Sequence, residues 1–167
     1  MPLNRLLLGL VCCLLATSCI KDNEEGANLE PGDRLPAFSV QLTDATVFNS
    51  QSLAGKGGMI VFFHTGCPDC QEELPRIQEL WDDATLRSSI WLVPISREQD
   101  GASIEAYWQA NGLTMPYNAQ TGRKIYSLFA SVSIPRIYVF SADGIIRHVY
   151  DDSYLPTADA LRANLSF

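Results

Sequence analysis

The sequence predicts an α/β fold in which a central mixed β-sheet is flanked by helices. Short apolar runs typical of strands alternate with segments of helical periodicity from residue 32 onward, which favours parallel β-α-β units with right-handed crossovers. Residues 59–63 form an unbroken apolar run, as expected of a strand that is buried on both faces. Asp143-Gly144 separates two strand-like runs, so we expect a terminal hairpin that gives the sheet an antiparallel edge.

The other elements follow from the same patterns. The predicted strands are residues 37–42, 59–63, 90–96, 136–140 and 145–150. The predicted helices are residues 68–84, 103–111, 124–131 and 157–165. Gly57 and Gly58 interrupt the chain before the second strand, and Gly112 ends the second helix because glycine tolerates the backbone conformation of a helix end.

The composition excludes two classes of protein. Of the 167 residues, 47% are apolar, enough for one domain with a hydrophobic core, which argues against intrinsic disorder. The 12 basic side chains are outnumbered by 19 acidic ones, so the net charge is −7. Because nucleic-acid binding draws its affinity from neutralising phosphates, nucleic acid is not expected as a partner.

The five cysteines need an explanation, because an odd number cannot all pair within one exported chain. Residues 6–16 form an apolar run after Arg5, shorter than the ~20 residues of a membrane-spanning helix and typical of a signal-peptide core. The run ends in Ala16-Thr17-Ser18-Cys19, which resembles the lipobox of bacterial lipoproteins except that Ala16 stands where leucine is usual.

This lipobox implies a signal peptide over residues 1–18, a lipidated Cys19, a flexible tether over 19–31 and one domain over 32–167. A plain secretory signal or a buried N-terminal helix is the alternative. The lipid would anchor the protein to a membrane of the cell envelope, facing the periplasm or the cell surface. The acidic residues at 22–25 also resemble the export flank of Bacteroidota surface lipoproteins. Cys67 and Cys70 are then the cysteines left for chemistry.

Cys67 and Cys70 lie where a buried strand runs into a helix. Unpaired amides and the positive end of the helix dipole favour negative charge there, so a thiolate at Cys67 is stabilised. Pro68 fits the first turn because that position needs no hydrogen-bond donor. Cys70, one turn later, is close enough to form a disulfide or to attack one. We therefore expect Cys67 to be the exposed nucleophile and Cys70 the resolving thiol.

A structural disulfide and a zinc site are the alternatives for this pair. A bridge across two intervening residues would constrain the unfolded chain little. A zinc ion would need two more ligands, and in the mature chain only His64 and His148 are left to supply them. We therefore expect neither a metal nor another cofactor.

Several short motifs, in a specific order, carry a resemblance to a known family. Cys67-Pro68-Asp69-Cys70 is a CxxC active-site motif, Pro75 follows inside the helix, and Ile134-Pro135 precedes a strand. These features resemble the extracytoplasmic TlpA-like group of thioredoxin-fold thiol–disulfide oxidoreductases, in which Pro75 would kink the helix and Pro135 would be a cis-proline. The resemblance implies a thioredoxin-like fold with an N-terminal strand extension and, at residues 115–129, a central insertion of a strand and a helix.

The resemblance also implies a role for the residues around the cysteines. Those that would contact the substrate chain are Gly66, Pro68, Ile134 and Pro135, and Pro135 would belong to the catalytic site as well. Gly66 stands where the family commonly has tryptophan, which opens the approach to the nucleophile. Val61 stands where thioredoxin has a buried aspartate, so proton transfer must use another group.

Glu73 is the candidate for that proton transfer. It shares one helix face with Cys70, Leu74 and Ile77, and it matches a glutamate that members of this family carry three residues after their second cysteine. An apolar surrounding disfavours the charged carboxylate, so it raises the pKa and suits Glu73 to accept the Cys70 proton. The alternative is a solvated carboxylate, which is what we expect of Glu72.

Three further side chains near the motif have weaker signals. His64 ends the strand and, when protonated, would favour a thiolate at Cys67; the alternative is that it only fills space. His148 is interpreted as structural. Asp69 opposes the helix dipole beside Cys67, which favours a reductant over a strong oxidant.

The sequence thus predicts a monomeric, lipid-anchored thiol–disulfide oxidoreductase of the cell envelope. Its partners would be protein disulfides and an upstream protein electron donor. A peroxiredoxin-like thiol peroxidase is one alternative, although such enzymes place a threonine three residues before their cysteine and Thr65 is two before Cys67. A module that binds Cu(I) through Cys67, Cys70 and a histidine is another.

Overall fold

The computed structural model describes residues 27–166. The predicted signal peptide, Cys19 and most of the predicted tether lie outside these residues. Within them, no helix has the length and apolar character needed to cross a membrane. The last part of the predicted tether contacts the domain, since the amide of Leu29 donates to the carbonyl of Phe129 at 2.9 Å.

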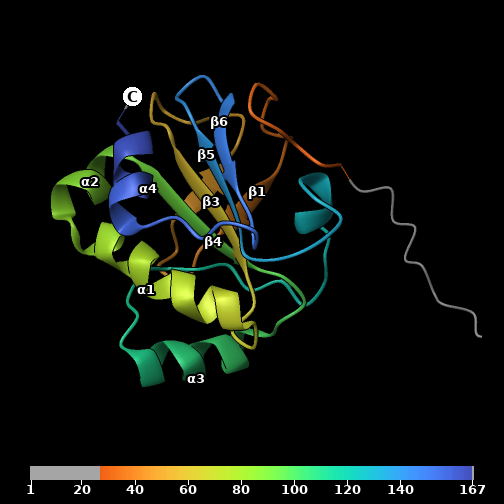
Figure 1. The fold of residues 1–167 in the computed structure, drawn as a ribbon, viewed down its shortest axis with the longest axis vertical. Coiled ribbons are helices and arrows are strands. Elements are labelled where there is room, and N and C mark those ends of the chain that lie inside the picture. The colour runs from red at the N-terminus through yellow and green to blue at the C-terminus, as the bar shows by residue number, and fades with distance from the viewer. Residues whose placement is uncertain (1–26, 167) are drawn as a thin grey trace, which may run out of the picture.

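A four-stranded mixed sheet forms the centre of the domain (Figure 1). In spatial order its strands are β4 (Trp91–Ser96), β3 (Gly58–Phe63), β5 (Arg136–Phe140) and β6 (Ile146–Tyr150). β3 pairs with β4 in parallel, whereas β5 is antiparallel to both β3 and β6. The predicted mixed sheet and its antiparallel hairpin edge are confirmed, and every residue of β3 is buried as the apolar run predicted.

Two short strands form the predicted N-terminal extension. β1 (Ser39–Gln41) lies inside the predicted strand, and it pairs antiparallel with β2 (Val47–Asn49), which the sequence analysis missed. Only the central residue of β2 is buried, so its apolar pattern is too short to identify. In the turn between the two strands, Ala45 has a φ of 68°. Glycine or asparagine usually occupies this conformation, so the alanine gives no turn signal in the sequence.

Among the described residues, four α-helices alternate with the strands of the central sheet along the chain. They are α1 (Pro68–Asp82), α2 (Ala84–Ser89), α3 (Gly101–Asn111) and α4 (Ala158–Asn164). Gly112 ends α3 at a φ of 65°, as predicted. The helix predicted over 68–84 instead ends at Asp82. Asp83 then caps a second helix by accepting from two amides of α2, a stop and restart that hydrophobic periodicity alone does not indicate.

The helix predicted over residues 124–131 is a further correction. The structure has a single 3-10 turn there, η1 (Tyr126–Leu128). Two bonds of α-helical spacing form around η1, but the chain then turns away with Ser133 at a φ of 57°. The additional strand expected in this insertion is reduced to one parallel bridge between Ile95 and Asn118.

Each face of the sheet has its own hydrophobic core. Helices α1, α3 and α4 cover one face through residues such as Leu74, Trp108 and Leu161. The β1–β2 pair and η1 cover the other face through Phe48 and Tyr126. α1 follows the central strand β3 after a short loop. The cysteine motif therefore lies at the carboxyl end of β3, in the middle of the sheet.

Candidate redox site

Cys67 is the N-cap residue of α1. Its backbone is extended, and its Sγ atom accepts a hydrogen bond from the amide of Cys70 at 3.4 Å. Pro68 occupies the first turn, where it removes no helical hydrogen bond. The amides and the dipole of α1 therefore point their positive end at the sulfur, as the sequence predicted.

The two cysteines differ in access to solvent. Cys67 is partly exposed, whereas Cys70 is 0% exposed and packs in the core beneath α1. Burial raises the pKa of the Cys70 thiol far above its ordinary value, and the neighbouring Cys67 adds to the effect, against a smaller lowering by the backbone of His64. Cys70 therefore holds its proton at neutral pH.

The peptide bond between Ile134 and Pro135 is cis, as the family resemblance implied. The thiol of Cys67 donates to the carbonyl of Ile134 at 3.5 Å. Tyr126 holds this loop through hydrogen bonds. Its hydroxyl donates to the carbonyl of Ser133 at 2.6 Å and also to the carbonyl of Val132. No sequence signal identifies Tyr126, since a buried aromatic residue in a helix-like segment is usually a core residue.

Glu73 lies on the buried face of α1 and is 1% exposed, as predicted. Arg76, one turn later, donates to Glu73 Oε2 at 3.0 Å, while Glu73 Oε1 has no hydrogen-bond partner among the described residues. Burial raises the pKa of Glu73 to about 7, and the lowering by Arg76 offsets only part of that effect. Glu72 is exposed, as predicted, and also bonds to Arg76.

The loop that enters the motif is held by two side chains. Nδ1 of His64 accepts from the amide of Gly66 at 2.9 Å, so the imidazole organises the loop beside Cys67. A Cβ atom on Gly66 would lie 3.2 Å from that ring, which explains the glycine by close approach. Gln99, which sequence reasoning missed, pairs with the buried Thr65 through both the amide and the hydroxyl of the threonine.

The side chains of the two alternative functions are not gathered at this site. The hydroxyl of Thr65 is bonded to Gln99, and the thiol of Cys67 is bonded to the carbonyl of Ile134. Among residues 27–166, no three His, Cys, Asp or Glu side chains are placed to hold one metal ion. His148 is exposed on β6, where it stacks on Tyr150.

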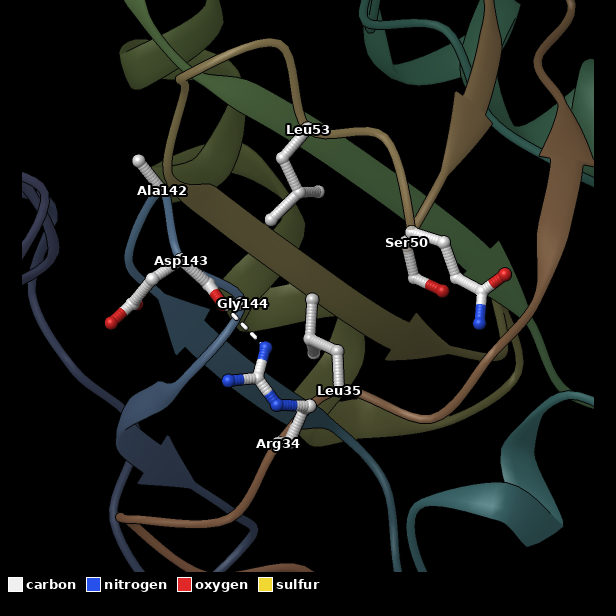
Figure 2. Close-up of a pocket in the computed structure, with 8 residues that line it drawn as sticks. Arg34, Leu35, Ser50, Leu53, Ala142, Asp143 and Gly144 are labelled. Carbon is white, nitrogen blue, oxygen red and sulfur yellow. Dashed lines mark hydrogen bonds between the residues drawn. The ribbon is translucent and has the colours of Figure 1, made fainter.

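A cavity of about 320 Å³ lies at the opposite end of the sheet (Figure 2). It is formed by the loop before β3 and the turn after β5, whereas the cysteines follow the other end of β3. The guanidinium of Arg34 donates to the carbonyl of Asp143 across it at 2.7 Å. Ser50 is also paired, with the amide of Phe38 and the carbonyl of Pro36. The Arg34 bond joins the N-terminal segment to the hairpin, and the Ser50 bonds join that segment to the loop after β2, so these bonds have a structural role.

The comparisons with known proteins agree with this geometry. The model of the AhpC/TSA family matches residues 31–149, which is most of the chain. The chain belongs to the AhpC/TSA family. The match covers β1 through β5 and nearly all of β6, so it includes both the cysteine motif and the cis-proline loop.

Curated relatives of this family member are distant but extend over most of its length. The thiol-disulfide oxidoreductase ResA of Bacillus thuringiensis is 22% identical over 153 residues, which cover 86% of each protein. The thioredoxin-like protein YneN of Bacillus subtilis is 21% identical, covering 77% of this chain and 75% of that protein.

Solved structures confirm the thioredoxin-like fold. A thiol:disulfide interchange protein of the thioredoxin family from Chlorobium tepidum superposes with a TM-score of 0.67 at 23% identity, covering 83% of this chain and 97% of that one. StoA from Bacillus subtilis also gives 0.67, at 22% identity, with coverage of 80% and 98%.

Proposed function

We propose that this protein is a thiol–disulfide oxidoreductase in which Cys67 and Cys70 exchange with protein disulfides. The observation that carries the proposal is the unequal environment of the two thiols: Cys67 is partly exposed at the helix N-terminus, and Cys70 is buried one turn later. In one turnover the reduced pair gives two electrons to a substrate disulfide. The substrate becomes two thiols, and Cys67 and Cys70 become a disulfide.

The first step is attack by the Cys67 thiolate on one sulfur of the substrate disulfide. The substrate S–S bond breaks, one substrate thiolate leaves, and a mixed disulfide joins Cys67 to the other substrate sulfur. The amide of Cys70 and the dipole of α1 stabilise the negative charge on Cys67 before attack. The cis-proline loop, whose Ile134 carbonyl already contacts Cys67, supplies backbone groups for an extended substrate chain.

The second step is resolution by Cys70. Because burial keeps this thiol protonated, Glu73 accepts its proton: the S–H bond of Cys70 breaks and an O–H bond forms on the carboxylate. The Cys70 thiolate then attacks Cys67 Sγ, the new disulfide forms, and the second substrate thiolate leaves. A carboxyl with a pKa of about 7 is ionised in roughly half of the molecules at neutral pH, which suits a base.

The roles of the cysteines are tested by trapping with a disulfide-bonded peptide. Cys70→Ser should accumulate the mixed disulfide with the peptide, because the resolving thiol is missing, and Cys67→Ser should not. Mass spectrometry of samples quenched with acid measures both. Equal trapping by the two variants would overturn the assignment.

The role of Glu73 is tested by the release step alone. Glu73→Gln should slow resolution of the preformed mixed disulfide near pH 7 by roughly a hundredfold, the lower end of the usual range for general base catalysis. Glu79→Gln is the matched control, since Glu79 lies on the same helix but is exposed. An unchanged release rate in Glu73→Gln would remove Glu73 from the mechanism.

We propose further that the enzyme works in the cell envelope, held to the membrane by lipid on Cys19. The signal-like run and the lipobox support this, and one similar solved structure is that of a pneumococcal exposed lipoprotein thioredoxin, with a TM-score of 0.64 at 16% identity. Its protein substrates and its electron donor would then be proteins of the same compartment. Cys19→Ala should move the protein from the membrane fraction to the soluble fraction and abolish labelling by a fatty-acid analogue; retention of both would contradict the anchor.

A further inference from the structure

Arg76 connects three groups around the buried carboxyl. One terminal nitrogen donates to Glu73 Oε2 at 3.0 Å and lies 3.4 Å from the carbonyl oxygen of Pro156, and the other donates to Glu72 Oε1 at 2.5 Å. The Arg76 side chain is 27% exposed and the Glu72 side chain is 59% exposed. The guanidinium therefore lies between solvent and the interior carboxyl, and its planar donors fix the carboxyl in one orientation.

The same arrangement leaves one carboxyl oxygen unused. Glu73 Oε1 is buried without a hydrogen-bond partner among the described residues, which is unusual because buried polar atoms are nearly always paired. An unpaired, buried carboxylate oxygen costs free energy, so its presence here calls for a functional reason. Cys70 is buried on the same helix face, one turn earlier.

We propose that Arg76 is a positioning residue that reserves Glu73 Oε1 for the proton of Cys70 by holding Glu73 Oε2. This inference rests on the proposed function of Glu73 as the base of the resolving step. Arg76 touches neither thiol in the structure, so it acts through the carboxyl. The carbonyl of Pro156, in the segment before α4, keeps the guanidinium in place, which connects the base to a second element of the fold.

Electrostatics gives Arg76 a second effect on Glu73. The charged groups that act on the carboxyl are Arg76, which lowers its pKa, and Glu72, which raises it, both on α1. The segment before α4 contributes the uncharged carbonyl of Pro156. On the opposite side of Cys70, Tyr107 of α3 is the titratable neighbour; its pKa is raised by burial and by Cys70, so it stays neutral. Arg76 is thus the cation that keeps the base ionised near neutral pH.

Arg76→Met tests the proposal through the pH profile of mixed-disulfide release. Loss of the cation should raise the midpoint of the profile by about one pH unit, the lower end of what an adjacent arginine does to a carboxyl. At pH 7 the protonation of Glu73 should lower the release rate about fivefold. At pH 9 this part of the loss should disappear, because a base with the higher pKa is ionised there, and the release rate should recover to that of Arg76→Lys. Carbon-13 NMR of the Glu73 carboxyl should show the same shift in its titration.

Matched variants separate positioning from a structural role. Arg87→Met removes the same charge from α2, where Arg87 stacks on Trp81, and should leave the midpoint unchanged. Arg76→Lys keeps the charge but not the two-armed contact, so its midpoint should stay near that of the natural protein while its release rate falls at every pH. Glu72→Gln removes the neighbouring negative charge and should move the midpoint downward.

The outcomes also distinguish this inference from the function on which it rests. If Glu73→Gln leaves release unchanged, the proposed base is wrong. If Glu73→Gln slows release but Arg76→Met leaves the midpoint of the profile where it was, Glu73 acts without Arg76 and the positioning role is overturned. A loss in Arg76→Met that is the same at pH 7 and pH 9 would also overturn it, because a purely structural defect is not repaired by raising the pH.

Discussion

The Sγ atom of Cys67 and the carbonyl oxygen of Ile134 lie 3.5 Å apart, although 67 residues separate them in the chain. Their proximity follows from the sheet. Cys67 comes shortly after the end of β3, and Ile134 comes shortly before the start of β5, and these two strands are antiparallel neighbours with Phe62 opposite Arg136. The proposed nucleophile and the loop proposed to bind the substrate are therefore brought together by one strand pairing.

The raised pKa of Glu73 makes the stability of the protein depend on pH. A carboxyl whose pKa rises from 4.5 to about 7 on folding binds its proton more tightly in the folded state. Its contribution is fully present below pH 4.5 and is lost as the pH rises through about 7. Urea denaturation of the reduced protein should show Glu73→Gln to be more stable than the natural protein at pH 8 by about 3 kcal/mol, as an order of magnitude.

Below pH 4.5 this difference should close, because both side chains are then uncharged. Glu79→Gln, an exposed position on the same helix, is the control and should show no such pH-dependent gain. A Glu73→Gln protein whose advantage is the same at pH 4 and pH 8 would contradict the buried, titrating carboxyl. The prediction implies that this protein carries a base at the expense of stability.

Tyr126→Phe should loosen the cis-proline loop without disturbing the core. The ring would keep its edge contact with Phe62 and its place beneath the Arg97 guanidinium, but the hydroxyl that holds the carbonyls of Val132 and Ser133 would be lost. We expect a loss of about 1 kcal/mol in the free energy of unfolding and a rise in KM for a disulfide-bonded protein. Tyr138→Phe, at a buried tyrosine that bonds to Phe129, is the control and should leave KM unchanged.

Gly66 and His64 should be coupled. Gly66→Ala places a Cβ atom 3.2 Å from the imidazole, so the ring must shift and its bond from the Gly66 amide must lengthen. With His64→Ala in the background the same change should be nearly neutral. A double-mutant cycle on the rate of attack by Cys67 measures this coupling, which we expect at about 0.5–1 kcal/mol; strict additivity would show that the close approach has no effect on the site.

Gln99→Ala should destabilise the loop that precedes Cys67. It removes the hydrogen-bond partner of both the amide and the hydroxyl of the buried Thr65, and unpaired buried groups cost about 2 kcal/mol in the free energy of unfolding. Gln109→Ala on the exposed side of α3 is the control and should change stability by less than about 0.5 kcal/mol. A similar effect of both variants would remove Gln99 from the support of the site.

The fold was predictable where one pattern dominated. The buried run of β3, the glycine at the end of α3 and the Asp143-Gly144 turn each specify a local structure, and each is confirmed. The prediction was wrong around η1 because apolar residues at helical spacing pack equally well from an irregular segment. Ser133, with its positive φ, ends that segment and leads the chain into the cis-proline loop. No local sequence pattern indicates this end.

The residues of the site that carry the chemistry were more predictable than the residues that hold the surrounding loops in place. Cys67, Cys70 and the cis-proline have short motifs, and the burial of Glu73 followed from its helix face. Tyr126 and Gln99 have no such signal, because each acts on a segment remote in sequence. The contact of Arg76 with Glu73 could have been predicted from the sequence, since a cation three residues after a carboxyl is a standard helical pair.

The antiparallel register of β3 and β5 also has a practical meaning for work on this protein. A slip of one residue would displace the sulfur from its loop by about 3 Å and turn each strand's side chains to the opposite face. A form that loses this strand pairing also loses the contact between Cys67 and the Ile134 loop. Turnover of a protein substrate, which the proposed function places against that loop, is therefore also a measure of the tertiary integrity of this enzyme, and inactive preparations should first be suspected of misfolding.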